Sequence, residues 1–454
     1  MSAHRIVIVC GCVWWLFCAA TASHAQSAAE WQALQTAAST KSDKIMAEAK
    51  GHKRLLGQYM VMRQAYASDN SPAFRLIFGQ YVSWYQSFLG DYPDAMKSFS
   101  IAQSPQQDDS PSPLTDGSYA ARPAVTAIPQ LAKSYRVVLF NEAHNIVLTR
   151  SLTVQLLQAL HEEGFNYFAA ETLVQSDTGL ASRGYATDDS GFYTEEPIYA
   201  EMVRTALKLG FKVIAYEATS SNASGDAREA EQAHHIYEQV FAHDPHARLI
   251  VNAGYEHIVK SGDYLGGSSM AEHLYKLIQV PMLSVEQTMM YPHPSEHDDH
   301  PYYVAVMKQL RPDAPIVFVN ASGKPWALRS AYDVNVFFPP EQMVRGRPTW
   351  LSLGGMRRAY RIDAGNCSGH YPCLVEARYS NEGADAIPAD RVVLDQVPLS
   401  VSASQIALYS STQGIPSSDL YLRPGKYALD FIGGNDRILH KEELVVPPSS
   451  EKPN

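Results

Sequence analysis

Carboxylate and imidazole side chains follow the short apolar runs in the middle third of the chain, where they could carry out acid–base chemistry. The polar residues that follow these runs are Glu142, His144, Glu171, Glu217, His257, Glu286 and Asn320. If the runs are parallel strands, their carboxyl ends meet at one edge of a sheet, where open α/β folds bind ligands. Carboxylates gathered there repel one another, so we expect a bound cation or raised pKa values to offset the charge.

Hydrolysis of an ester or amide bond is the reaction that these residue types favour. His144 would act as a general base on water, or Glu142, His144 and His257 would hold a divalent metal such as Zn or Mn that lowers the pKa of a bound water. Glu171 would orient the water or share its proton. Arg150, at the start of the next predicted helix, would clamp an anionic group or pair with Glu171, unless it is an ordinary surface arginine.

Several of these residues also have a purely structural interpretation. Glu217 and Glu286 could cap the helices that follow them, since carboxylates favour helix N-termini. His257 could be a hydrogen-bonded structural histidine. We nevertheless keep Glu217, Glu286 and His293 as candidate cofactor-binding residues.

A histidine-rich loop is expected at residues 291–301, which contain three histidines and three acidic residues. It follows the fifth apolar run, so we expect it at the same edge as the other candidates. The loop is either a lid or metal-recruiting segment, or a mobile solvated loop. With Tyr255 and Tyr291 it also suggests a non-enzymatic alternative, a cell-envelope protein that binds haem, metal or another small ligand, because Tyr and His both ligate haem iron.

The elements that must position these residues alternate along the chain between strands and helices. Buried strands are predicted at 136–140, 167–170, 212–216, 248–251, 282–285 and 316–319. Helices are predicted between them at 152–162, 199–209, 227–241 and 271–278. The alternation predicts an α/β fold whose mainly parallel, Rossmann-like sheet has helices on both faces. The sequence contains no Gly-x-Gly-x-x-Gly, Walker, Gly-x-Ser-x-Gly or His-Glu-x-x-His motif.

The regions on either side of this core differ from it in composition. Residues 1–25 are predicted to be a signal peptide cleaved after Ala25, with an uncleaved anchor as the alternative. The protein would then be periplasmic or secreted, and the mature chain would have no integral membrane span. The remaining predicted regions are a helical segment at 26–102, a linker at 103–133, the α/β core at 134–353 and a small β-rich module at 354–454.

Cys367 and Cys373 are the two cysteines that remain after removal of the signal peptide, and they lie in a turn-rich loop. In an oxidising compartment they would form one disulfide bond, with two free thiols as the alternative. The formal net charge is −10, which argues against nucleic acid or an anionic membrane as the main partner. A small-molecule or peptide substrate is the expected partner.

Residues 134 to 330 resemble a known superfamily. The apolar strand that leads into Glu142-Ala143-His144-Asn145, with a helix near Arg150 and a strand ending at Glu171, resembles the erythromycin-esterase-like, ChaN-like and TraB/Tiki superfamily. Gly254-Tyr255-Glu256-His257 matches its second motif, a Gly-x-x-His turn, whereas Asn141 stands where the first motif usually has glycine. The resemblance implies a Rossmann-like sheet with a hydrolytic or haem- or metal-binding site. It implies that Glu142, His144, Glu171 and His257, with Arg150, form this site.

Overall fold

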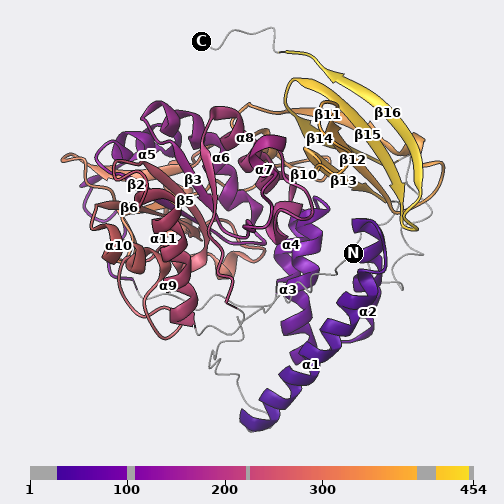
Figure 1. The fold of residues 1–454 in the computed structure, drawn as a ribbon, viewed down its shortest axis with the longest axis horizontal. Coiled ribbons are helices and arrows are strands. Elements are labelled where there is room, and N and C mark those ends of the chain that lie inside the picture. Colours follow the sequence, from indigo (N-terminus) through magenta and orange to yellow (C-terminus); the bar gives the residue numbers. More distant parts are fainter. Residues whose placement is uncertain (1–27, 100–107, 221–224, 396–415, 449–454) are drawn as a thin grey trace.

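The computed structural model describes residues 28–99, 108–220, 225–395 and 416–448. The predicted signal peptide lies outside these residues. A helical N-terminal segment, a central α/β region and a β-rich C-terminal region follow one another along the chain (Figure 1). None of the described helices is long and apolar enough to cross a membrane.

An eight-stranded sheet forms the centre of the molecule, with strand order β1-β7-β8-β6-β2-β5-β3-β4. The six strands from β8 to β4 in this order are parallel, which confirms the predicted fold class. These parallel strands are β2 (Val137–Glu142), β3 (Tyr167–Ala170), β4 (Lys212–Ala215), β5 (Leu249–Gly254), β6 (Met282–Met290) and β8 (Val334–Phe337). At one edge, β7 (Ile316–Asn320) runs antiparallel to β8 and also pairs antiparallel with the outermost strand, β1 (Tyr119–Pro123).

Helices cover both faces of this sheet because alternate strand residues point to opposite sides. Val138 and Phe140 of β2 belong to one buried cluster, and Val137 and Leu139 belong to the other. The helices of the first cluster are α5 (Ala124–Ala132), α6 (Val147–Glu162) and α8 (Pro197–Leu209). Those of the second are α9 (Gly225–Ile236) and α10 (Met270–Ile278). A strand that is buried on both faces has apolar residues at successive positions, and the predicted strands of this sheet have such apolar runs.

The edge of the sheet differs from the prediction in three ways. The predicted linker at 103–133 contains β1 and α5. The predicted sixth strand, β7, runs antiparallel to its neighbour β8, so Asn320 lies at the opposite edge from the other candidates. β8, which was not predicted, pairs with β6 in its place. Strands of four or five residues carry little periodicity, so pairing with their neighbours decides where they form and in which direction they run.

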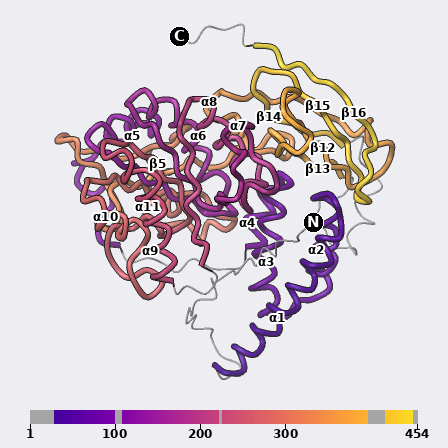
Figure 2. Tube along the Cα trace, viewed as in Figure 1, coloured from indigo at the N-terminus to yellow at the C-terminus, as the bar shows by residue number. Residues whose placement is uncertain are grey.

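The N-terminal segment consists of helices that pack on the β-rich region (Figures 1 and 2). Leu374 and Ile432 of that region belong to the same buried cluster as the helix residues, and Leu56, Tyr59 and Phe78 are among the buried side chains of the helices. The helices are α1 (Ala28–Ala49), α2 (Leu55–Ser68), α3 (Pro72–Phe88) and α4 (Tyr92–Ser98).

The C-terminal region is antiparallel, as predicted. A four-stranded sheet has the order β13-β12-β15-β16, and β11 pairs with β14. These strands are β11 (Arg358–Asp363), β12 (Cys373–Tyr379), β13 (Asp390–Leu394), β14 (Ser417–Leu422), β15 (Gly425–Gly433) and β16 (Ile438–Val446). Cys367 and Cys373 form a disulfide bond with their Cα atoms 6.0 Å apart.

Candidate active site

Three neighbouring parallel strands, β2, β5 and β3, bring the main candidates to one edge of the sheet. Glu142 is the last residue of β2, and Glu171 follows β3 directly. His257 lies in the single turn (Tyr255–Ile258) that follows β5. Glu142, His144, Glu171 and His257 are all buried. The predicted meeting of carboxylates and imidazoles at the carboxyl edge is therefore present, and it is shielded from bulk water.

Arg150 of α6 holds Glu142 in place. Its Nη2 donates to Glu142 Oε1 at 2.7 Å, and its Nε donates to Oε2 at 3.0 Å. Asn252 Nδ2 donates to the same Oε2 at 2.9 Å. Burial by itself would raise the pKa of Glu142, but the charge of Arg150 and the hydrogen bonds from His144 and Asn252 outweigh it, so the pKa lies below its usual value. Glu142 is therefore a carboxylate fixed by a two-point contact.

Arg150 is neither a surface arginine nor a partner of Glu171, two of the alternatives that the sequence suggested. It is fully buried, and it pairs with Glu142 and with Glu196 rather than with Glu171. Glu196 precedes α8, where it accepts hydrogen bonds from Ile198 N and Tyr199 N, both at 2.9 Å. Burial raises the pKa of Glu196 even though Arg150 opposes this effect. The guanidinium is held between two carboxylates because it lies under the edge of the sheet rather than on the surface.

His144 is oriented by Glu142 on one side and by aromatic rings on its faces. Its Nδ1 lies 3.1 Å from Glu142 Oε1. The imidazole stacks on Tyr193 with ring centroids 3.9 Å apart and meets the edge of Tyr255 at 5.2 Å. Its Nε2 faces Glu171 Oε2 at 4.0 Å. A carboxylate at Nδ1 favours the proton on that nitrogen, which leaves the Nε2 lone pair directed at the centre of the site.

His257 has a similar arrangement with a different carboxylate. Its Nδ1 lies 2.7 Å from Oε2 of Glu229, a fully buried residue of α9. Its Nε2 lies 3.5 Å from Glu171 Oε1. Burial alone would lower the pKa of His257, but the charges of Glu229 and Glu171 outweigh it and raise the pKa. The environment of His257 therefore favours the cationic form of its imidazole.

Glu171 lies between the two histidines. It accepts a hydrogen bond from the backbone N–H of Gly254, and Arg228 Nη2 lies 3.5 Å from its Oε1. A Cβ at position 254 would collide with the His144 ring, so only glycine fits there. The close packing of the His144 ring against Gly254 therefore explains why the Gly-x-x-His turn begins with glycine.

Asn141 has a structural role at the position where the resembling superfamily has glycine. Its Nδ2 donates to the carbonyl of Tyr255 at 2.8 Å, and its Oδ1 accepts from the backbone N–H of Gln287 at 2.6 Å. The side chain therefore joins the ends of β2 and β6 to the turn after β5. These side-chain hydrogen bonds of Asn141 stabilise the backbone at this edge of the sheet.

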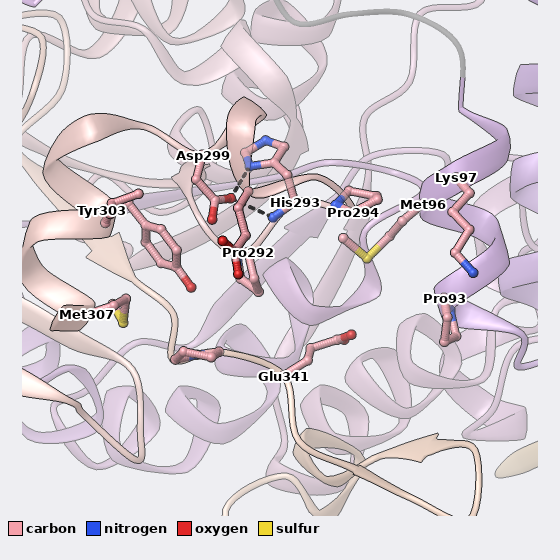
Figure 3. Close-up of a pocket in the computed structure, with 13 residues that line it drawn as sticks. Pro93, Met96, Lys97, Pro292, His293, Pro294, Asp299, Tyr303, Met307 and Glu341 are labelled. Atoms are coloured by element: carbon pink, nitrogen blue, oxygen red, sulfur yellow. Dashed lines mark hydrogen bonds and ion pairs between the residues drawn. The ribbon is translucent and has the colours of Figure 1, made fainter.

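Of the remaining candidates, Glu217 contacts this cluster through Arg228, which also lies near Glu171. His293 lies apart from it. Glu217 pairs with Arg228 at 2.9 Å, and although burial opposes it, the charge of Arg228 lowers the pKa of Glu217. Glu286 accepts from Asn335 Nδ2 at 2.6 Å, and burial raises its pKa. His293 pairs with Asp299 at 3.0 Å beside a separate pocket (Figure 3).

The structure does not bring the predicted metal ligands to one point. Both carboxylate oxygens of Glu142 accept hydrogen bonds from Arg150, and one of them also contacts His144 Nδ1. His257 Nδ1 contacts a different carboxylate, that of Glu229. Among the described residues, no group of three or more His, Cys, Asp or Glu is arranged to hold a metal ion. The two tyrosines suggested as haem ligands flank different imidazoles, Tyr255 that of His144 and Tyr291 that of His293. Metal and haem binding stay predictions.

Sequence reasoning missed four residues that complete the site: Glu196, Arg228, Glu229 and Asn252. Asn252 stands at the end of an apolar run and could have been found by the same rule as Glu142. Glu229 and Arg228 lie in a helix rich in charged residues, which is indistinguishable in sequence from a solvent-exposed face. Their partners follow only from the packing of α9 against the sheet.

No model of a known protein family matches the chain, and no curated protein matches it. Among solved structures, the type III effector HopBA1 aligns at 11% identity over 50% of this chain and 99% of its own, with a TM-score of 0.28. A structure of bacterial protein toxins aligns at 14% identity over 57% of each chain, with a TM-score of 0.29. RRSP, a MARTX toxin effector domain from Vibrio vulnificus, aligns at 13% identity over 50% of this chain and 51% of its own, with a TM-score of 0.27. Similarities this low carry no argument, and the resemblance to the erythromycin-esterase-like, ChaN-like and TraB/Tiki superfamily stays a prediction.

Proposed function

We propose that the carboxyl edge of β2, β5 and β3 catalyses the hydrolysis of an ester or amide bond, with His144 as the general base. The observation that carries this proposal is the orientation of His144. Its Nδ1 faces Glu142 at 3.1 Å, Arg150 clamps that carboxylate, and its Nε2 faces the centre of the site. A base whose ring is fixed by a carboxylate is the arrangement that general-base catalysis requires.

In the proposed reaction, water between His144 and Glu171 gives a proton to His144 Nε2 and its oxygen bonds to the substrate carbonyl carbon. Glu142 stabilises the imidazolium that forms. The negative charge on the carbonyl oxygen would be stabilised by Arg228, whose side chain is about one-third exposed. When the tetrahedral intermediate collapses, the C–O or C–N bond breaks and the leaving group takes the proton from His144. His257, whose Nε2 lies 3.5 Å from Glu171 Oε1, holds Glu171 in position.

We further infer that the protein acts outside the cytoplasm. The sequence of residues 1–25 favours export. The disulfide bond between Cys367 and Cys373 supports an oxidising compartment, where such bonds persist. A small-molecule or peptide ester or amide of that compartment is the proposed substrate class.

The test compares residues 26–454 with His144→Gln on a panel of aryl esters, alkyl esters and peptides. We expect His144→Gln to lose about 10²- to 10⁴-fold in kcat/KM, the usual contribution of a general base. The matched control is His234→Gln, because His234 of the nearby helix α9 is an exposed histidine that pairs with the exposed Glu238. Melting temperatures of both variants separate loss of chemistry from loss of fold.

Two results would contradict the proposal. One is turnover by the wild type that His144→Gln leaves unchanged. The other is a lack of turnover across the panel, with and without added Zn²⁺ or Mn²⁺, combined with a Soret band on haem addition that depends on His144. That second result would favour the non-enzymatic binding protein.

A further inference from the structure

A second site lies away from the candidate active site of Glu142, His144, Glu171 and His257. A pocket of about 530 Å³ opens between α4, the loop after β6 and helix α11 (Pro301–Leu310) (Figure 3). Its walls are largely apolar and include Met96 of α4 and Met307 of α11. Pockets of this size bind small molecules through apolar walls and a few placed polar groups.

The first of these polar groups is the hydroxyl of Tyr303. Tyr303 is 3% exposed, and among the described residues its hydroxyl has no hydrogen-bond partner. Figure 3 shows its ring directed from α11 into the pocket. A buried polar group without a partner costs about 1–3 kcal/mol, so a ligand that supplies the missing hydrogen bond gains from contact with it.

The second polar group is Glu341, which follows β8. Its Oε1 accepts a hydrogen bond from Trp350 Nε1 at 2.6 Å. Burial raises the pKa of Glu341 although this hydrogen bond opposes the rise. A cation beside the carboxyl group would favour its charged form.

The charges that line the pocket favour a cationic ligand. Three carboxylates line it, those of Glu296, Asp299 and Glu341, against one lysine. That lysine, Lys97, is 62% exposed and pairs with Asp94 at 3.1 Å, so it does not offset Glu341. Asp299 is already paired with His293. Glu296 is exposed to solvent, so Glu341 is the part-buried carboxylate available to a ligand.

We propose that this pocket binds a small organic amine, with its apolar group against Met96 and Met307 and its ammonium group against Glu341. The Tyr303 hydroxyl accepts a second hydrogen bond from the ammonium group. Glu142, His144, Glu171 and His257 do not line this pocket. Amine binding is therefore proposed to be independent of the proposed hydrolysis.

The experiment titrates residues 26–454 with 2-phenylethylamine, 2-phenylethanol and phenylacetate by isothermal calorimetry. These three probes share an aromatic group and differ in the charge of the polar end. We expect the amine to bind at least about 10-fold more tightly than the alcohol or the acid, since a charge-assisted hydrogen bond is about twice as strong as a neutral one.

Variants locate the binding site. Glu341→Gln keeps an oxygen for Trp350 and is expected to weaken amine binding about 10-fold, and Tyr303→Phe about 3-fold. Tyr302→Phe and His144→Gln are the controls and are expected to leave it unchanged. Three results would overturn the proposal: acid binding as tight as amine binding, amine binding that survives Glu341→Gln, or no heat of binding up to about 10 mM amine.

Discussion

The two sites of this chain differ in how their buried polar groups are satisfied. At the sheet edge, the charged groups are paired: Arg150 is bonded to Glu142 and Glu196, and each imidazole has its own carboxylate. Asn252 Oδ1 and Glu229 Oε1 are buried there without a hydrogen-bond partner among the described residues, but the other polar atom of each side chain is bonded. In the pocket between α4 and α11, the hydroxyl of Tyr303 has no partner among the described residues. Groups fixed before a substrate arrives suit catalysis, because no reorganisation is needed during the reaction. An unsatisfied group suits binding, because the ligand supplies the missing bond.

The largest effect is expected for Arg150→Met. Removing the guanidinium leaves Glu142 and Glu196 buried without their cation, and breaking a buried ion pair in this way costs about 3–5 kcal/mol of unfolding free energy. Urea denaturation followed by circular dichroism measures the change. The matched variant Lys41→Met breaks the exposed pair with Asp69 and is expected to cost at most about 1 kcal/mol. Equal losses for both variants would contradict the argument.

Gly254→Ala is expected to have the next largest effect. The new Cβ collides with the His144 ring, and such overpacking costs about 1–3 kcal/mol. Turnover should fall further than stability, because the displaced group is the proposed base. Gly434→Ala is the control, since its Cβ would meet only ordinary contact with Met60. An active, fully stable Gly254→Ala protein would show that the close approach is unimportant.

The pH dependence of stability should show the cationic state of His257. Its folded-state pKa lies above the usual histidine value of about 6.5, so its contribution to stability is fully present below about pH 6.5 and is lost as the pH rises through the raised pKa. Glu229→Gln removes the largest cause of the raised pKa, so this loss should become smaller. Histidine NMR titrations and urea denaturation across the same pH range measure both quantities. Identical titration of His257 in the two proteins would refute this assignment.

The smallest effect is expected for Tyr303→Phe. Because the buried hydroxyl makes no hydrogen bond to the described residues, its removal should not lower the free energy of unfolding below that of the wild type. Tyr199→Phe is the matched change at the other site, where the hydroxyl donates to the carbonyl of Glu171. It should cost about 1 kcal/mol. A loss for Tyr303→Phe as large as that for Tyr199→Phe would remove the distinction between the two sites.

The sequence by itself determined the parallel sheet and the edge at which its polar residues meet. Apolar runs that end in Glu142, Glu171 and Asn252 require strands buried on both faces, and parallel strands place their carboxyl ends together. The disulfide between Cys367 and Cys373 was also predictable, since two cysteines in one loop had no other partner in the mature chain.

Only the tertiary structure decided which charges meet. Glu229, the partner of His257, lies in a helix that the periodicity located without revealing which side chains face inward. Glu196, a partner of Arg150, lies just before another helix, outside the predicted range. The tertiary structure also determined that β7 runs antiparallel to β8, which places Asn320 at the opposite edge of the sheet from the other candidates. Periodicity reports which side chains are buried, whereas ion pairing depends on distances of a few ångströms between elements far apart in the chain. Those distances exist only once the sheet and its helices have packed.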